Sequence, residues 1–220
     1  MTHRQSFHGK NATMTPEVPD EIRVYLAGPD VFLREAGALA ERKRKLCADY
    51  GFAGMSPLDN EISLEDLSQH EAALRIGAAN EGMIRSCHLV IANLTPFRGP
   101  SADVGTAYEI GFARALGLPV FGYTNVAGTL LDRTRQALGA EVTREPTGRY
   151  ADAYHMAVED FDCIDNLMLV IAIEGSGSHI VVSPTADDSR FTDLAGFEAC
   201  LKLAAEQRDA GARWEGTREG

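Results

Sequence analysis

The sequence predicts an open, doubly wound α/β fold with about five parallel strands and helices on both faces of the sheet. Apolar runs of strand length alternate with longer segments of helical periodicity along most of the 220 residues. This alternation implies right-handed βαβ crossovers. The run HLVIANL, residues 88–94, is almost continuously apolar, which is typical of a parallel strand covered on both faces.

The first half of the chain predicts two strand and helix pairs. The run RVYLAG, residues 23–28, is the first buried strand, and a segment rich in Ala, Arg and Lys from about Arg34 to Tyr50 is the first helix. A short strand at 52–56 then precedes a helix from about Leu64 to Ser86, in which apolar residues recur at helical spacing.

The second half begins with the strand 88–94 and a helix that carries Glu109. This helix ends around Gly117, because Leu118-Pro119 stops it before the strand VFGY. The segment from Asn125 to Tyr154 is mostly polar and receives no assignment, and Asp165 to Ile173 is an apolar patch. A fifth βα unit is completed by a strand at 179–183 and a helix at 193–207.

The domain boundaries follow from where apolar periodicity starts and stops. Residues 1–20 are polar and predict a disordered N-terminal arm, residues 21–208 form one domain, and residues 209–220 predict a flexible tail. A chain of this length with 45% hydrophobic residues can bury a substantial single core.

Composition excludes several classes of function. The net charge of −11 repels phosphate backbones, so nucleic acid is not an expected partner, and the basic run from Arg42 to Lys45 is interpreted as a solvated helix face. Four widely spaced cysteines and six histidines show no metal-ligand spacing. No apolar stretch of membrane-spanning length and no signal peptide is visible, and we expect a cytoplasmic protein without membrane partner, metal or cofactor.

The segment SADVGTAYEIGFARA, residues 101–115, carries the candidate chemistry. Glu109 lies inside a small, apolar helical segment, and Asp103 precedes it by six positions. A carboxylate there needs a partner or a task, although a Glu in a helix is most often a solvated surface residue. Paired carboxylates are the usual groups for cleaving a glycosidic bond.

The spacing of the two acids sets a geometric condition. Six helical residues turn through about 600° and rise about 9 Å, so Asp103 and Glu109 would diverge on one regular helix. They converge only if Asp103 precedes the first turn. Asp is also a preferred helix N-cap, so a purely structural role for Asp103 stays open beside the catalytic one.

Three loops should meet where the strands end, since ligands bind outside the carboxyl ends of parallel strands. AGPDVF follows the first strand, SPLDNE the second and NLTPFRGPSAD the third. The first loop lacks both GxGxxG and GxxxxGK[ST], which argues against a dinucleotide or P-loop site. We therefore expect Tyr25, Gly28, Asp59, Asn60, Asn93 and Asp103 to surround one crevice with Glu109.

Taken together, YLAGPDVF, PLDNE, NLTPFRGPSADVGTAYEIGFA and DNLML resemble the nucleoside 2-deoxyribosyltransferases, from about Tyr25 to Leu169. The resemblance implies a flavodoxin-like fold and exchange of one nucleobase for another on 2-deoxyribose, with retention, through a glycosyl ester of Glu109. By the same resemblance Asp103 is the acid/base that serves the departing base, and Tyr25 orients Glu109.

The resemblance also implies a set of substrate-binding residues and an oligomer. Asn166 and Met168 would enter the site from a neighbouring subunit of a homodimer or hexamer, the Asn toward the sugar 5′-hydroxyl and the Met toward the base. The expected ligands are a 2-deoxynucleoside and a free nucleobase. The candidate binding residues are Gly28, Phe32, Asp59, Asn60, Asn80, Asn93, Arg98, Asn166 and Met168.

Two alternatives stay open at this stage. A nucleoside or nucleoside 5′-monophosphate N-glycosidase would hydrolyse the same bond, and Arg98 and Ser101 are capable phosphate partners, whereas the carboxylate of Asp103 favours an uncharged nucleoside. A non-catalytic nucleoside sensor is the second alternative, because a fold does not fix a function.

Overall fold

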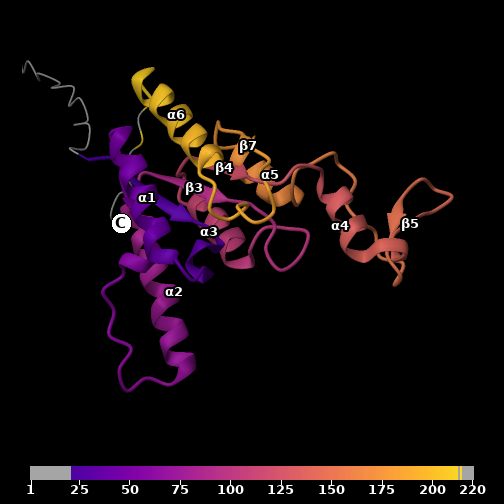
Figure 1. The fold of residues 1–220 in the computed structure, drawn as a ribbon, viewed down its shortest axis with the longest axis horizontal. Coiled ribbons are helices and arrows are strands. Elements are labelled where there is room, and N and C mark those ends of the chain that lie inside the picture. Colours follow the sequence, from indigo (N-terminus) through magenta and orange to yellow (C-terminus); the bar gives the residue numbers. More distant parts are fainter. Residues whose placement is uncertain (1–20, 213, 215–220) are drawn as a thin grey trace, which may run out of the picture.

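The computed structural model describes residues 21–212 and Trp214 (Figure 1). The predicted arm at 1–20 lies outside the described residues, and so do residue 213 and residues 215–220 of the predicted tail. Five parallel strands form the central sheet in the order β2-β1-β3-β4-β7, which confirms the predicted fold class. Their bounds are β1 Arg23–Ala27, β2 Ala53–Met55, β3 Leu89–Asn93, β4 Val120–Thr124 and β7 Ile180–Val182.

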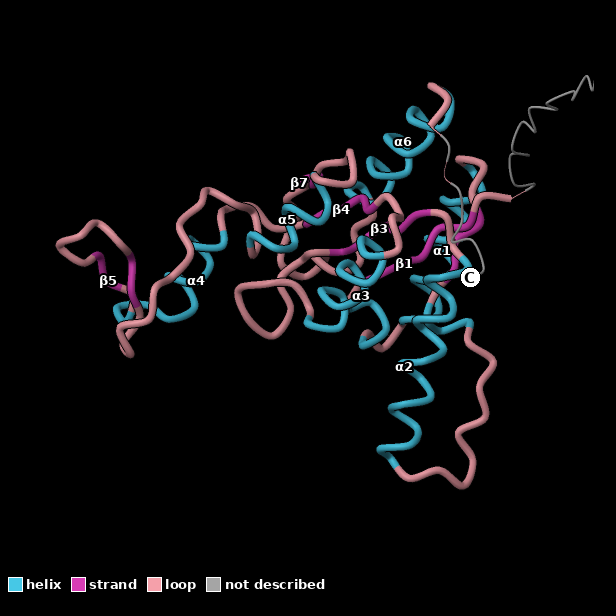
Figure 2. Tube along the Cα trace, turned by 180° about the vertical axis from the view of Figure 1, so that it is seen from behind, coloured by secondary structure: helices cyan, strands magenta, loops and turns pink. Residues whose placement is uncertain are grey.

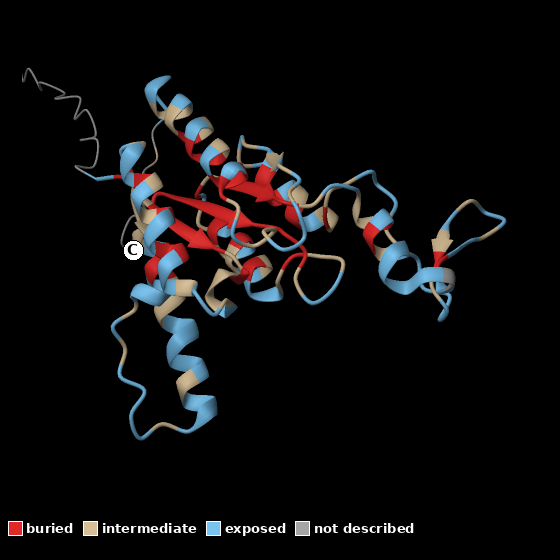
Figure 3. Ribbon diagram, in the orientation of Figure 1, coloured by how far each residue is buried: buried red, intermediate tan, exposed pale blue. Residues whose placement is uncertain are grey.

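Alternation along β1 divides the core into two apolar layers. Val24 and Leu26 pack with one cluster and Tyr25 and Ala27 with the other, because successive side chains of a strand point to opposite faces. The first cluster is covered by α1 (Ala36–Asp49) and α6 (Ala195–Asp209). The second is covered by α2 (Gln69–Ser86), α3 (Val104–Ala115) and α5 (Leu167–Glu174). The strands are buried between these helices (Figure 3).

Close packing of α5 depends on a glycine in β4. A Cβ on Gly122 would lie 2.7 Å from Cδ1 of Ile173 and 3.0 Å from Cδ1 of Leu94. Any side chain there would push the α5 helix off the sheet, since both neighbours are fully buried.

Two helices differ from their predicted extent or environment. The helix expected from Leu64 begins only at Gln69, because Ser68 and Glu71 form a reciprocal capping box that fixes the start. The interpretation of Arg42 to Lys45 as a solvated face is wrong for Lys43, which is buried and forms an ion pair with Asp30. An ion-paired lysine has the same sequence signature as a surface lysine.

The unassigned segment after β4 is an arm that extends away from the sheet (Figures 1 and 2). It contains α4 (Leu130–Leu138), a 3-10 turn at Gly139–Glu141, and a hairpin of β5 (Thr143–Arg144) and β6 (Tyr150–Ala151). Thr129 and Asp132 form a capping box at the start of α4, a spacing that is visible in the sequence. In the part of the chain that the structure describes, no helix is long and apolar enough to cross a membrane.

A buried ion pair joins the arm to the body. Arg133 of α4 donates to the carbonyls of Pro100 and Gly128, each at 2.7 Å, and contacts the Asp165 carboxylate at 3.4 Å. The Asp165 side chain, 1% exposed, also accepts from the backbone N–H of Ala102 and from the hydroxyl of Ser101. One carboxylate therefore holds the loop after β3, the base of the arm and the start of α5.

Replacing Asp165→Asn should lower the free energy of unfolding by about 3 kcal/mol, because the buried Arg133 guanidinium loses its counter-charge. Chemical denaturation monitored by circular dichroism measures the change, with the exposed Asp160→Asn as the matched control. Adding Arg133→Met to Asp165→Asn should restore part of the loss, since the unpaired charge is removed. Strictly additive losses in the double variant would contradict the proposed coupling.

Candidate active site

A short hydrogen bond between β1 and α3 forms the centre of the candidate site. The hydroxyl of Tyr25 donates to Oε1 of Glu109 at 2.5 Å. Tyr25 is fully buried in the sheet, whereas Glu109 is partly exposed. Burial and the neighbouring Glu109 both hold the pKa of the Tyr25 phenol above its usual range, so the phenol stays protonated and acts as the donor. One oxygen of Glu109 is thereby fixed.

The surroundings of the Glu109 carboxyl group raise its pKa toward neutrality. Burial raises the pKa of Glu109 to about 7; the Tyr25 hydrogen bond opposes this shift, and the charge of Asp103 adds to it. A near-neutral pKa is expected of the acid/base rather than of the nucleophile, so its appearance on Glu109 runs against the expectation from the sequence. A carboxyl that ionises near pH 7 inside a partly apolar site is a recurrent property of catalytic groups.

Asp103 lies just before α3, as the spacing of the two acids required. Its backbone has φ −60° and ψ 137°, outside the helical region, and its Oδ2 accepts from the backbone N–H of Thr106 at 3.1 Å. Asp103 is therefore the N-cap of the helix that carries Glu109. The charge of Asp103 contributes to the raised pKa of Glu109.

The loop after β1 is fixed by a buried polar group. Asp30 forms an ion pair with Lys43, and the Nδ2 of Asn93 donates to Asp30 Oδ1 at 3.0 Å. Burial alone would lower the pKa of Lys43, but Asp30 raises it above its ordinary value. The Oδ1 of Asn93 accepts from the backbone N–H of Thr95 at 3.0 Å, so both polar ends of this buried side chain are bonded within the chain.

Gly28 is explained by the same contact. A Cβ on Gly28 would lie only 2.8 Å from the Cβ of Asn93, which is too close for two carbon atoms that are not bonded. Any residue other than glycine at position 28 would therefore force the backbone to shift. The glycine thus lets the loop after β1 cross directly over the end of β3.

The two candidate binding residues in the loop after β2, Asp59 and Asn60, face different helices. Asp59 accepts from the backbone N–H of Ser56 at 2.8 Å and from Arg44 at 2.6 Å, so its carboxylate faces α1. Asn60 instead donates to the side chain of Asn80 at 2.8 Å. The structure therefore brings Asn60 and Asn80 together, as a side-chain pair between this loop and α2.

Arg98 and Phe32 meet at the end of the sheet, from the loops after β3 and β1. The Cζ atom of Arg98 lies 5.1 Å from the centre of the Phe32 ring and 4.6 Å from the centre of the Phe97 ring. Phe32 is 56% exposed and stacks on Phe97 with 5.2 Å between the ring centres. Ser101, the other candidate phosphate partner, donates its hydroxyl to Asp165.

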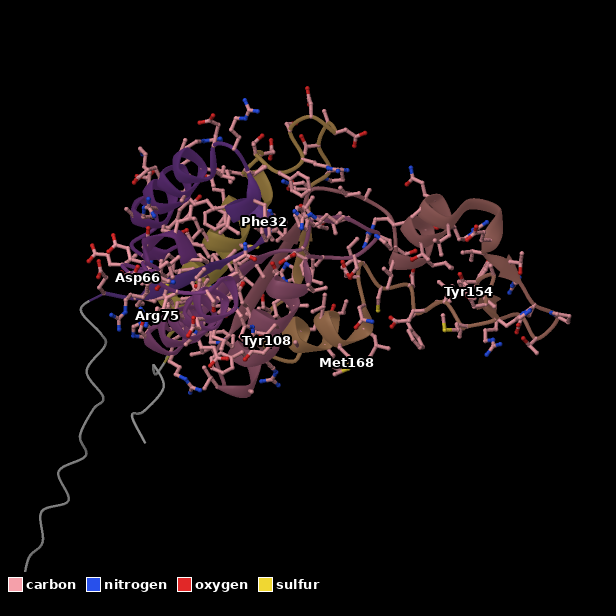
Figure 4. The ribbon with its side chains drawn as sticks, turned by 90° about the horizontal axis from the view of Figure 1, so that it is seen from below. Phe32, Asp66, Arg75, Tyr108, Tyr154 and Met168 are labelled. Atoms are coloured by element: carbon pink, nitrogen blue, oxygen red, sulfur yellow. The ribbon has the colours of Figure 1, made fainter. Side chains whose placement is uncertain are left out.

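Asn166 and Met168 lie at the start of α5, which packs against α3. Asn166 is the N-cap of this helix: its Oδ1 accepts from the Met168 backbone at 3.0 Å, and its Nδ2 donates to Glu159 at 2.5 Å. The Met168 side chain is 65% exposed and lies on the same side of the molecule as Tyr108, as Figure 4 shows.

Sequence reasoning missed several residues that organise this region. Lys43 and Arg133 stand in polar or basic segments that resemble surface sequence, and only their partners Asp30 and Asp165, which lie in the quoted AGPDVF and DNLML segments, explain their burial. Phe97 and Phe191 were also missed, although Phe97 lies in the quoted PFRG loop. Among the described residues, no group of three His, Cys, Asp or Glu side chains is placed to hold a metal ion.

A family model, a related sequence and a solved structure were each found to be similar to this chain. The sequence matches the family model described as "Nucleoside 2-deoxyribosyltransferase" over residues 24–168. It is 30% identical over 188 residues to the uncharacterized protein C191.05c of Schizosaccharomyces pombe, which covers 81% of this chain and 89% of that protein. The solved structure of a 2-desoxiribosyltransferase from Leishmania mexicana is 28% identical with a TM-score of 0.54, over 77% of this chain and 94% of that one. The chain belongs to the nucleoside 2-deoxyribosyltransferase family.

Proposed function

We propose that this protein transfers 2-deoxyribose between nucleobases, with Glu109 as the nucleophile. The observation that carries the proposal is the pairing of Glu109 with the buried Tyr25 hydroxyl at 2.5 Å, beside a second carboxylate, Asp103, that stands outside the helix. The similarity to the 2-desoxiribosyltransferase from Leishmania mexicana supports the same reaction class.

The reaction proceeds in two steps that use the two acids differently. A carboxylate oxygen of Glu109 attacks the anomeric carbon while the bond to the base nitrogen breaks, and Asp103 delivers a proton to the departing base. The incoming base then attacks the same carbon, the ester bond to Glu109 breaks, and Asp103 takes up the proton of the new base. Two inversions at one carbon produce overall retention.

Tyr25 acts by holding Glu109 in place. Because its hydroxyl occupies Oε1, the other carboxylate oxygen is left to face the sugar. The hydrogen bond also favours the ionised form of Glu109, which is the form that attacks. Tyr25 is therefore a positioning residue in this mechanism.

The proposed site is shared between subunits of a homo-oligomer. Large apolar side chains are exposed along α2, α3 and α5: Leu74, Ile76, Val104, Tyr108, Met168 and Ile171. A second copy that covers this face would explain them, and it would bring Asn166 and Met168 of one copy toward the site of the next.

Incubation with 2′-deoxyinosine and adenine should produce hypoxanthine and 2′-deoxyadenosine, measured by chromatography. Glu109→Gln should lower the rate by at least about a thousandfold, because the amide cannot form the ester. The exposed Glu206→Gln is the matched control.

Three other outcomes of this experiment would contradict base exchange through Glu109. Free deoxyribose without a new nucleoside identifies a hydrolase. No reaction with any deoxynucleoside or deoxynucleotide identifies a sensor. Unchanged exchange in Glu109→Gln removes Glu109 as the nucleophile.

The pH dependence of kcat/KM should follow the titration of Glu109. Since its pKa is raised to about 7 and the ionised form attacks, kcat/KM should fall about tenfold per pH unit below this value. Tyr25→Phe should move the midpoint to higher pH, because the lost hydrogen bond had lowered the pKa. A midpoint that stays in place in Tyr25→Phe would contradict the assignment.

The same pKa is measurable without catalysis. A carboxyl whose pKa is higher in the folded protein than in the unfolded chain stabilises the fold. This contribution is fully present at pH values below the pKa in the unfolded chain, near 4.5, and is lost as the pH rises through about 7. Thermal denaturation should show Glu109→Gln gaining stability relative to the parent protein between pH 5 and 8. A constant difference over this range would contradict the raised pKa.

Placing a charge on the exposed face of α5 should separate the subunits. Ile171→Glu changes a side chain that is 61% exposed and should convert the oligomer to monomers with loss of base exchange, as measured by analytical ultracentrifugation and activity. Lys202→Glu, on the exposed side of α6, is the control. An active monomeric Ile171→Glu protein would contradict a shared site.

A further inference from the structure

Three phenylalanines from three different loops meet at the carboxyl edge of the sheet. Phe32 follows β1, Phe97 follows β3, and Phe191 follows β7. The Phe97 ring stacks on Phe32 and meets Phe191 edge-on, with 6.1 Å between the ring centres. We call these three residues the phenylalanine cluster; the proposed chemistry of the carboxylates assigns it no task.

Arg98 lies close enough to two rings of this cluster to be held there. Its Cζ atom is within about 5 Å of two ring centres, a distance at which a guanidinium is attracted to the ring faces. Its backbone adopts φ +56°, a left-handed conformation that is uncommon for arginine. Within the described residues Arg98 makes neither a hydrogen bond nor an ion pair, and its side chain is exposed. Its N–H donors are therefore open to a ligand.

Buried polar groups hold the cluster's loops in place. Asp30, two positions before Phe32, is bonded to both Lys43 and Asn93. On the other side, the Nδ2 of the buried Asn125 donates to the carbonyls of Arg190 at 2.9 Å and Asp193 at 3.0 Å, which flank Phe191. The platform is thus assembled before a ligand arrives.

The chain connects this platform directly to the reacting groups. Arg98 lies five positions before Asp103, in the loop that leads from β3 to the Glu109 helix. Phe32 lies in the loop that Gly28 lets pass over Asn93. Figure 4 shows Phe32 on a different side of the molecule from Met168. Phe32 and Arg98 follow the carboxyl ends of β1 and β3, and α3 with its two acids starts from the same loop as Arg98, so the cluster is placed to hold the leaving or entering base.

We propose that Arg98 makes 6-oxopurines, hypoxanthine and guanine, the preferred bases over adenine in the exchange, a specificity that rests on the proposed function. A guanidinium donates two parallel hydrogen bonds to the O6 and N7 acceptors of a 6-oxopurine, and a base linked through N9 leaves both atoms free. Adenine presents an amino donor at position 6, which repels the same N–H groups, and a pyrimidine has no N7. The exposed face of Phe32 supplies the stacking surface.

Competition between two acceptor bases tests this specificity. 2′-Deoxyguanosine is supplied as donor with equal concentrations of hypoxanthine and adenine, and the ratio of 2′-deoxyinosine to 2′-deoxyadenosine is measured at early times. Both products come from one intermediate, so general damage to the fold changes the rates but not the ratio. Arg98→Met keeps an apolar stem on the rings, Arg98→Gln offers an amide that pairs with adenine N6 and N7, and Arg75→Met is the remote control.

The expected ratio favours 2′-deoxyinosine in the parent protein and in Arg75→Met. It should fall about tenfold in Arg98→Met, and further in Arg98→Gln. Replacing hypoxanthine by 7-deazahypoxanthine, which lacks N7, should remove most of the difference between the parent protein and Arg98→Met. An unchanged ratio in Arg98→Met, or a ratio that falls equally in Arg75→Met, would overturn the proposal.

A binding measurement separates this proposal from base exchange itself. If the parent protein forms no new nucleoside, the proposed function fails, and calorimetry on the Glu109→Gln protein then decides the role of Arg98. That protein should bind 2′-deoxyinosine more tightly than 2′-deoxyadenosine, and adding Arg98→Met should weaken only the former, by about tenfold. Equal weakening of both ligands would overturn the proposal.

Discussion

Tyr25 lies in the middle of the apolar layer beneath α3, and its hydroxyl must find a partner there because a buried, unbonded hydroxyl is costly. The partner is Glu109 of α3. This bond ties α3 to β1, and the side chain of Asp103 caps the start of the same helix. The position of the Glu109 carboxylate thus depends on one hydroxyl inside the core.

The carboxyl edge of the sheet is ordered by side chains that bond one another. Asp30 links the loop after β1 to Asn93 at the end of β3, and Thr95 continues the connection, since its hydroxyl accepts from the backbone N–H of Asn125 at 3.1 Å. Asn125 then holds the loop that carries Phe191. Loops that would otherwise be independent are joined at the ends of four strands, which suits the proposed site, where a sugar and two successive bases would be held in one geometry.

The fold and the position of Asp103 ahead of the Glu109 helix were predictable from sequence because both depend on local patterns. Continuous apolar strands and helical periodicity gave the order of elements, and the six-residue spacing of Asp103 and Glu109 placed the former ahead of the helix. Lys43, Asp165 and Arg133 were not predictable in this way. Each is a charged residue whose burial depends on a partner at least 13 positions away. The secondary structure of the arm was not predicted for a related reason, since its short elements have few apolar residues.

The anchoring of the arm by Asp165 has a consequence for how this chain can be modified. Loops that extend from a domain are normally the parts that tolerate deletion or the insertion of another domain. Here the guanidinium at the base of the arm binds the Pro100 carbonyl, and the carboxylate opposite it binds Ser101 and Ala102, immediately before Asp103. A minimal version of the enzyme therefore has to retain α4 and the segment that returns to α5. The hairpin beyond α4 makes none of these contacts and is the place to shorten the chain or attach a fusion partner.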